Sequence, residues 1–246
     1  MKPKVAVFDF TCCEGCELQI LNCETEMPKL VAALDIVEFR EAMTEQAEHY
    51  DIAFIDGACS TEAEIRRLKD IRKRAKMVIP IGACACLGGV NCLKNSYSMS
   101  KLLKADYGDD AQHFNTIPAR PVSAVIPIDF FIPGCPIVRK EFVRVVGELL
   151  AGRVPYQPSD PVCAECKLAG NVCVFEKGLT CLGPVTRGGC EATCVTAGAV
   201  CWGCRGLIDE PNVNAERLIL EQAGLSVDDI LKKFDLFNVC QEKTWQ

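Results

Sequence analysis

Val5-Ala-Val-Phe-Asp-Phe10 is the first of a series of short apolar runs that decide the fold of this 246-residue chain. The later runs are Ile36–Phe39, Ile52–Asp56, Met77–Ile81 and Val122–Ile128. Short continuous apolar runs are typical of strands that are buried on both faces, as they are in parallel sheets. We therefore predict a buried strand at each run.

Amphipathic stretches that resemble helices lie between these runs. Thr61–Ala75 opens with Thr61-Glu-Ala-Glu64, which has the spacing of a capping box. Val138–Ala151 has helical spacing of its apolar residues and is followed by Gly152, as expected at a helix C-terminus. Alternating strands and helices predict a parallel sheet covered on both faces. We predict an α/β fold, in which a flavodoxin-like doubly wound domain spans residues 1–154.

The composition changes in residues 155–246, which we predict to be a second, small cysteine-rich domain followed by C-terminal helices. Three prolines mark the linker: Pro155, Pro158 and Pro161. The segment from Cys163 to Gly206 has little periodicity and buries too little apolar surface to fold alone, so metal binding must supply much of its stability. Helical patterns return at Asn214–Gln222 and Ile230–Phe237, the second capped by Ser226-Val-Asp-Asp229.

Eight of the 18 cysteines fall between Cys163 and Cys204 of this second domain, in two groups of four. The groups are Cys163, Cys166, Cys173 and Cys181, and then Cys190, Cys194, Cys201 and Cys204. Four thiolates are what one tetrahedral metal ion or one iron–sulfur cubane requires. Chain order alone would also permit the last cysteine of one run to serve the other centre, as in two-cluster ferredoxins.

Four further cysteines follow predicted strands of the first domain: Cys13, Cys16, Cys84 and Cys135. They fall beyond the carboxyl ends of parallel strands, where the ligand sites of open α/β sheets gather. Glycines accompany them, namely Gly15, Gly82, Gly88, Gly89 and Gly134, and these allow the backbone to approach a bulky cofactor. The sequence thus predicts three metal centres in one chain, and therefore a protein that moves electrons.

The overall composition limits the partners and the cellular location that we expect for this protein. A net charge of −6 and the lack of a basic stripe argue against a nucleic-acid partner. No run approaches 18 apolar residues, so we expect no membrane span. The N-terminus lacks the pattern of an export signal, and we expect a cytoplasmic protein, in which clustered cysteines bind metal more often than they form disulfides. His49 and His113 have no ligand-like spacing.

Four motifs occur in an order that resembles the small, electron-transferring subunit of nickel–iron hydrogenases. They are Thr11-Cys-Cys-Glu-Gly-Cys-Glu-Leu18, Gly82-Ala-Cys-Ala85, Pro133-Gly-Cys-Pro136 and Cys181-Leu-Gly-Pro-Val-Thr-Arg-x2-Cys190. The resemblance, which runs from Val5 to Gly206, is to the cytoplasmic, cofactor-coupled branch (group 3, sulfhydrogenase or F420-non-reducing type). It implies three 4Fe–4S clusters and a separate large catalytic subunit with the nickel–iron centre. It also implies a diaphorase, flavin or ferredoxin-type acceptor, and no catalytic residue in this chain.

The same resemblance implies which cysteines hold each cluster. Cys13, Cys16, Cys84 and Cys135 match the ligands of the proximal cluster, and Cys163, Cys166, Cys173 and Cys181 those of the distal cluster. Cys190, Cys201 and Cys204 match the medial ligands. Many periplasmic relatives have histidine in place of Cys163 and a three-iron medial cluster. Because Cys194 supplies a fourth medial ligand, we expect a 4Fe–4S cluster there.

Two other classes of protein fit part of the pattern. A quinone-proximal subunit of a complex I-like assembly shares the N-terminal fold and has a related cysteine site, but it lacks the eight-cysteine module. A zinc-stabilised interaction protein would use the same thiols as structural staples.

Several residues near the predicted ligands have open roles. We interpret Cys12, Cys59 and Cys86 as small buried hydrophobic residues, although Cys12 and Cys86 could tune or replace a ligand. Cys23, Cys92 and Cys240 receive no role. Glu14 and Glu17 flank the first ligand pair and are interpreted as solvated or interface carboxylates, with a proton relay as the alternative. Thr186 and Arg187 could each hydrogen-bond a cluster sulfur, and a structural salt bridge is the alternative.

Overall fold

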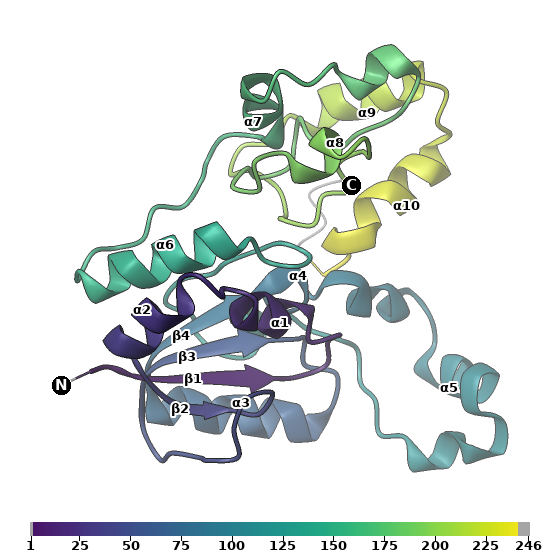
Figure 1. Cartoon of the computed structure of the whole chain (residues 1–246). Helices are drawn as coiled ribbons and strands as arrows, with labels where there is room; N and C mark the ends of the chain where they lie inside the picture. The colour runs from purple at the N-terminus through teal and green to yellow at the C-terminus, as the bar shows by residue number, and fades with distance from the viewer. Residues whose placement is uncertain (1, 241–246) are drawn as a thin grey trace.

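A four-stranded parallel sheet forms the centre of the N-terminal part of the protein (Figure 1). The computed structural model describes residues 2–240. The strands are β1 (Lys4–Asp9), β2 (Asp35–Phe39), β3 (Tyr50–Asp56) and β4 (Ala75–Ile81), in the order β2-β1-β3-β4. In the register of β1 and β3, Val5 lies opposite Ile52 and Asp9 opposite Asp56. This is the strand order of a flavodoxin-like sheet, and it confirms the predicted fold class.

The prediction of a fifth strand at Val122–Ile128 is wrong. This segment forms a short 3-10 turn, η3 (Val122–Ala124), and the following chain meets β4 at a single bridge between Ile81 and Ile132. Pro121 precedes the run and Pro127 lies within it, and proline cannot donate a ladder hydrogen bond. Val122 and Ile126 are nevertheless buried in the core, so the apolar pattern reflects burial without a strand.

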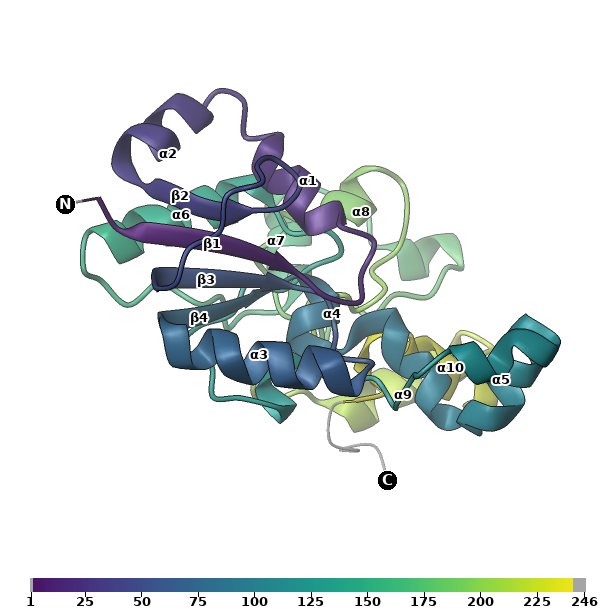
Figure 2. The same ribbon diagram turned by 90° about the horizontal axis from the view of Figure 1, so that it is seen from below.

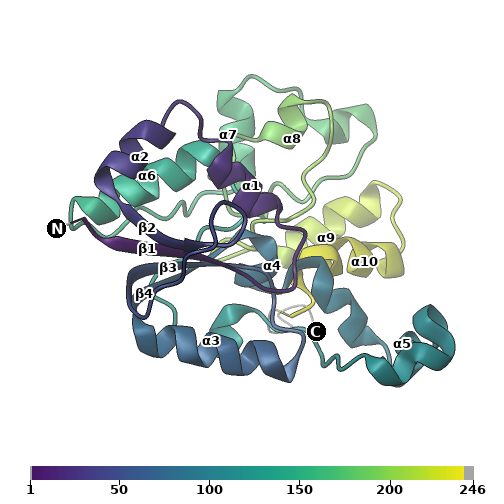
Figure 3. The same cartoon turned by 60° about the horizontal axis from the view of Figure 1, so that its bottom comes forward.

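Helices cover both faces of the sheet (Figures 2 and 3). One face packs against α1 (Gly15–Leu21), α2 (Met27–Ala33) and α6 (Arg139–Leu150), and the other against α3 (Glu62–Arg74). Successive strand residues alternate between these two cores: Val5 and Val7 face the first, and Ala6 and Phe8 the second. The doubly wound arrangement follows from this alternation.

Local capping confirms the predicted helix ends. Thr61 accepts a hydrogen bond from the N–H of Glu64 at 3.1 Å, and the Glu64 carboxylate accepts one from the N–H of Ser60 at 2.8 Å. Gly152, just past α6, has a φ of +67°, the left-handed conformation that glycine favours at this position.

Four helical segments lie between β4 and η3. They are α4 (Gly82–Leu87), η1 (Gly89–Ser96), α5 (Met99–Tyr107) and η2 (Gly108–His113). The part with α5 and η2 projects from the body of the protein, and neither element contributes a buried residue (Figure 1).

The cysteine-rich part lies beyond the carboxyl edge of the sheet (Figure 1). It contains α7 (Val162–Leu168), η4 (Val174–Lys177) and α8 (Thr193–Thr196), and it is followed by α9 (Val213–Gln222) and α10 (Val227–Asn238). Ser226 caps α10 by accepting from the N–H of Asp229 at 3.2 Å. The predicted helical tail is therefore confirmed. No helix within residues 2–240 has the length and apolar character needed to cross a membrane.

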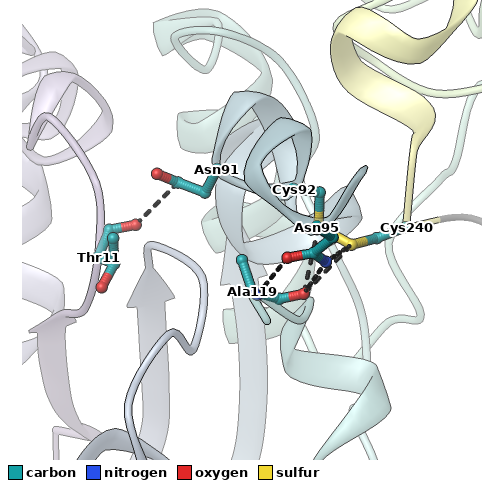
Figure 4. Close-up of a disulfide and its surroundings, with 6 residues drawn as sticks. All are labelled: Thr11, Asn91, Cys92, Asn95, Ala119 and Cys240. Atoms are coloured by element: carbon teal, nitrogen blue, oxygen red, sulfur yellow. Dashed lines mark hydrogen bonds between the residues drawn. A yellow bond between two sulfur atoms is a disulfide. The ribbon is translucent and has the colours of Figure 1, made fainter. Parts of the chain in front are cut away.

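A disulfide between Cys92 of η1 and Cys240, just after α10, joins segments that are 148 residues apart (Figure 4). Asn95 donates to the Sγ of Cys240 at 3.2 Å, and its amide group pairs with the backbone of Ala119 in both directions at 2.8 Å. The bond therefore ties the end of α10 to the segment that follows α4.

We predict that Cys240→Ser lowers the free energy of unfolding by about 2–4 kcal/mol, because the disulfide restricts the unfolded chain. Thermal denaturation with and without a thiol reductant measures this loss, and reductant should remove the difference between wild type and variant. Cys23→Ser, at a free buried cysteine, keeps the disulfide, so reductant should lower its stability by as much as it lowers that of wild type. A Cys240→Ser protein as stable as wild type without reductant would contradict the pairing.

Candidate metal centres

The four predicted proximal ligands meet at the carboxyl edge of the sheet. Cys13 and Cys16 follow β1, Cys84 lies in α4 directly after β4, and Cys135 lies in the loop before α6. Burial, followed by the charges of Asp56, Cys135 and Cys13, raises the pKa of Cys84 to about 12. The Cys84, Cys135 and Cys13 thiols are thus electrostatic neighbours, as convergence at one sheet edge predicts.

Glycines leave room around these sulfurs. Gly82 has a φ of +78°, and a Cβ there would overlap the Sγ of Cys16 and lie 3.3 Å from Oδ1 of Asp56. A Cβ at Gly15 would lie 3.4 Å from the Sγ of Cys13. Gly134, directly before Cys135, has a φ of +136°, which residues other than glycine rarely adopt. These positions form a cradle of thiols and bare backbone that suits an iron–sulfur cluster.

The predicted medial ligands share one cavity. It has a volume of about 600 Å³ and is lined by Cys190, Cys194, Cys201 and Cys204, and also by Cys135 of the proximal set. Ile137, Val195, Leu236 and Phe237 contribute apolar walls. The structure thus brings all four medial cysteines together, with one proximal ligand at the same cavity.

The predicted distal ligands form a neighbouring group. Burial, followed by the charges of Cys181, Cys166 and Cys173, raises the pKa of Cys163 to about 12, so the four thiols lie near one another. A Cβ at Gly183 would lie 3.3 Å from the Sγ of Cys163 and 3.4 Å from that of Cys181. The Sγ of Cys181 also accepts hydrogen bonds from the N–H groups of Gly183 and Cys201.

The medial and distal groups meet at Cys181 and Cys201. Their thiols hydrogen-bond each other, which lowers the pKa of Cys181 and raises that of Cys201. Thr186 also hydrogen-bonds the thiol of Cys201 and lines the shared cavity. Cys201 therefore contacts both groups.

All-thiol sets with free space and backbone donors fit iron–sulfur clusters, whose potentials respond to hydrogen bonds on sulfur. Within residues 2–240, no group of three or more His, Cys, Asp or Glu residues is arranged to hold a single metal ion. The four ligands of a cubane bind four different iron atoms, and so need not converge on one point.

A buried ion pair joins the segments that carry these cysteines. Arg205, directly after Cys204, is 1% exposed and donates to both carboxylate oxygens of Glu141 in α6 at 2.8 Å. Its guanidinium also donates to the carbonyls of Pro133 and Gly188 at 2.7 Å. These acceptors lie two residues before Cys135 and Cys190, so one side chain holds the loops of proximal and medial ligands to α6.

The carboxylates beside the first ligand pair differ from each other. Glu14 is 41% exposed and pairs with Arg40, as interpreted from the sequence. The interpretation of Glu17 as a solvated or interface carboxylate is wrong: it is 1% exposed, and both its oxygens lack a partner among the described residues. Burial, followed by the charges of Asp56 and Asp9, raises its pKa to about 8, so it holds a proton at neutral pH. The turn into α1 carries it inward, which sequence spacing did not reveal.

The other cysteines and Arg187 have mostly structural surroundings. Cys59 is fully buried in the core, as interpreted, and Cys86 donates to the carbonyl of Pro80 at 3.5 Å. Cys12 is half-buried, and its Sγ accepts from the N–H of Glu14 at 3.4 Å, near Asp56 and Cys84. Arg187 pairs with Asp209 and donates to the carbonyl of Pro158, so its role is the structural salt bridge.

Known proteins match this chain over most of its length. A family model described as NADH ubiquinone oxidoreductase, 20 Kd subunit, matches residues 13–149. Sulfhydrogenase 2 subunit delta of Pyrococcus furiosus is 35% identical over 237 residues, covering 95% of this chain and 98% of its own. A vhu subunit of the F420-non-reducing hydrogenase of Methanocaldococcus jannaschii is 31% identical over 269 residues, covering 96% and 93%.

Solved structures share the fold. An NAD+-reducing NiFe hydrogenase chain matches with a TM-score of 0.59 at 22% identity, covering 64% of this chain and 96% of that one. A Ni-Fe-Se hydrogenase chain from Desulfomicrobium baculatum matches with a TM-score of 0.58 at 15% identity, covering 88% and 98%.

The fold has thiols at the carboxyl edge of its sheet, and the relatives match over nearly the full chain. Together these features define an iron–sulfur electron-transfer protein. The chain belongs to the NADH:ubiquinone oxidoreductase 20 kDa subunit family and, within it, to the small, electron-transfer subunits of nickel–iron hydrogenases. The family model ends before the cysteine-rich part, whereas the matched hydrogenase subunits extend through it. The hydrogenase type is thus favoured over the complex I-like alternative.

We predict that Arg205→Met lowers the free energy of unfolding by about 3–5 kcal/mol, because it removes both close hydrogen bonds to the buried Glu141 carboxylate and leaves it only Arg144 at 3.9 Å. Arg217→Met, which removes the more exposed pair with Glu221, should cost at most about 1 kcal/mol. Thermal denaturation of the anaerobically purified variants compares the two. Equal midpoints for both variants would show that the Arg205–Glu141 pair has no special role.

Proposed function

We propose that this chain is the electron relay of a cytoplasmic nickel–iron hydrogenase. It carries electrons between the nickel–iron site of a large subunit and a diaphorase, flavin or ferredoxin-type partner, through three 4Fe–4S clusters. The observation that carries this proposal is the shared cavity: all four medial cysteines line it, and Cys135 of the proximal set lines it too. A medial cluster in that cavity would adjoin the proximal one.

Each cluster has its own ligand set in this proposal. Cys13, Cys16, Cys84 and Cys135 would hold the proximal cluster; Cys190, Cys194, Cys201 and Cys204 the medial cluster; and Cys163, Cys166, Cys173 and Cys181 the distal cluster. When bound, the clusters supply one-electron carriers with potentials of roughly −700 to +450 mV.

The chain's own residues would bind, space and tune these carriers. Arg205 hydrogen-bonds the loops that carry Cys135 and Cys190 and so fixes their relative position. Its guanidinium lies near the Cys190 and Cys204 thiols. Backbone N–H groups of Gly183 and Cys201 point at the Sγ of Cys181. Apolar side chains form part of the wall of the shared cavity in the middle of the path.

Both ends of the path reach the surface. Cys13 and Cys135 of the proximal set are exposed, which suits electron entry from a large subunit. Cys173 of the distal set is exposed, and Leu168 and Val172 beside it are 89% and 56% exposed. An apolar surface around an exposed ligand suits a partner that accepts the electrons.

The relatives narrow the class of acceptor without fixing it. The matched proteins are named as a sulfhydrogenase subunit and as subunits of F420-non-reducing hydrogenases. By analogy we place this chain in the same cofactor-coupled branch, where the acceptor is another protein subunit.

We predict about twelve iron atoms and about twelve acid-labile sulfides per chain, as three cubanes require. Anaerobic purification followed by colorimetric iron and sulfide assays measures both. The wild-type chain should contain no stoichiometric zinc. Zinc without sulfide would contradict the electron relay and would mean that the same thiols bind structural zinc ions.

We predict that Cys194→Ala changes the medial cluster alone, because the variant keeps only three medial thiolates. Electron paramagnetic resonance should show an intact proximal signal and a three-iron or missing medial signal. Cys23→Ala, at a buried cysteine whose Sγ donates to the carbonyl of Gln19, should leave every signal unchanged. Loss of the proximal signal in Cys194→Ala would mean that the ligand sets are wrongly divided.

A further inference from the structure

A buried lysine lies beside the two cysteines at which the medial and distal groups meet. Lys233 of α10 is 9% exposed, which is rare for lysine. Its Nζ lies 4.2 Å from the centroid of the Trp202 ring, a cation–π contact next to Cys201. Within residues 2–240 this ammonium makes no hydrogen bond and no ion pair with a carboxylate.

The charges around Lys233 are those of the relay. Burial lowers the pKa of Lys233, while the Cys181 and Cys201 thiols and the Glu216 carboxylate favour its charged form. Glu216 of α9 is 1% exposed, and neither of its oxygens has a partner among the described residues. Burial and the charge of Cys181 raise the pKa of Glu216, and Lys233 lowers it. A buried cation and a buried anion therefore both act on Cys181.

The fold fixes the position of both groups. Ile230 and Phe234 of α10 and Leu220 of α9 are buried together in one core. Gly203, between Cys201 and Cys204, has a φ of +81°, and a Cβ there would lie 3.5 Å from Nδ2 of Asn238. The helix thus lies directly against the loop of two medial ligands, and the disulfide at Cys240 anchors its end.

We propose that Lys233 and Glu216 act as opposed charges that set the reduction potential of the distal cluster, and with it the driving force between the medial and distal clusters. This inference rests on the proposed relay. Reduction adds one negative charge to a cluster, so a nearby cation favours the reduced form and a nearby anion favours the oxidised form. Both effects are strong here because the groups are shielded from water.

The two charges predict shifts of opposite sign. Lys233→Met should favour the oxidised distal cluster by about tenfold, which for a one-electron couple is a decrease of about 59 mV in midpoint potential. Glu216→Gln should raise the midpoint potential, because it removes a buried acidic group. Lys233→Arg keeps the charge and should restore a potential close to wild type. Lys232→Met is the matched control, since Lys232 is 70% exposed and pairs with Asp228.

The test is a redox titration of the anaerobically purified hydrogenase complex, followed by electron paramagnetic resonance. Opposite shifts for Lys233→Met and Glu216→Gln, with full iron content and an unchanged Lys232→Met, support the proposal. Shifts of the same sign, or no shift in either variant, overturn it while leaving the relay intact. If Lys233→Met loses iron, Lys233→Gln and Glu216→Gln decide by the same rule. A wild-type chain without iron and sulfide would overturn the relay itself.

Discussion

Four hydrogen bonds from one buried guanidinium hold the parts of this protein together. Arg205 reaches Glu141 of α6 twice and the carbonyls of Pro133 and Gly188 once each. Burying a charge is costly unless it is fully paired, and here every contact is made to a segment that must be fixed. The geometry of the cysteine-rich part relative to the sheet therefore depends on a residue that binds no metal.

The C-terminal helices complete what this ion pair begins. α10 contacts α4 and η1 on the sheet side, and its Leu236 and Phe237 line the shared cavity. A segment with little apolar surface of its own thus acquires a core from α9 and α10, whose Leu220, Ile230 and Phe234 pack on Leu182 and Val185. This helical cover stabilises the loops that carry the cysteines.

Sequence patterns predicted most of the strands and helices. They predicted little about which way individual side chains point. Four strands and the capped helices follow from apolar runs and from Thr61 and Ser226, because these signals are local. The fifth strand was overpredicted, since Val122 and Ile126 are buried without a ladder. Proline placement around that run was the signal that should have excluded it.

The cysteine sets could be located because the ends of parallel strands share an edge, and because the motifs matched a known family. The inward direction of Glu17, the burial of Lys233 and the pairing of Cys92 with Cys240 could not be derived. Each depends on tertiary contacts between residues far apart in the chain, and neither charge nor spacing indicates them.

The disulfide also changes the topology of the chain. Residues 92–240 form a closed covalent ring, and the ring contains Cys135 and all eight cysteines of the cysteine-rich part. A ring gains less entropy on opening than a free tail does. When the cysteine-rich part unfolds locally, the segment that carries its thiols consequently stays attached at both ends to the sheet domain. The cysteines therefore remain close to their folded positions.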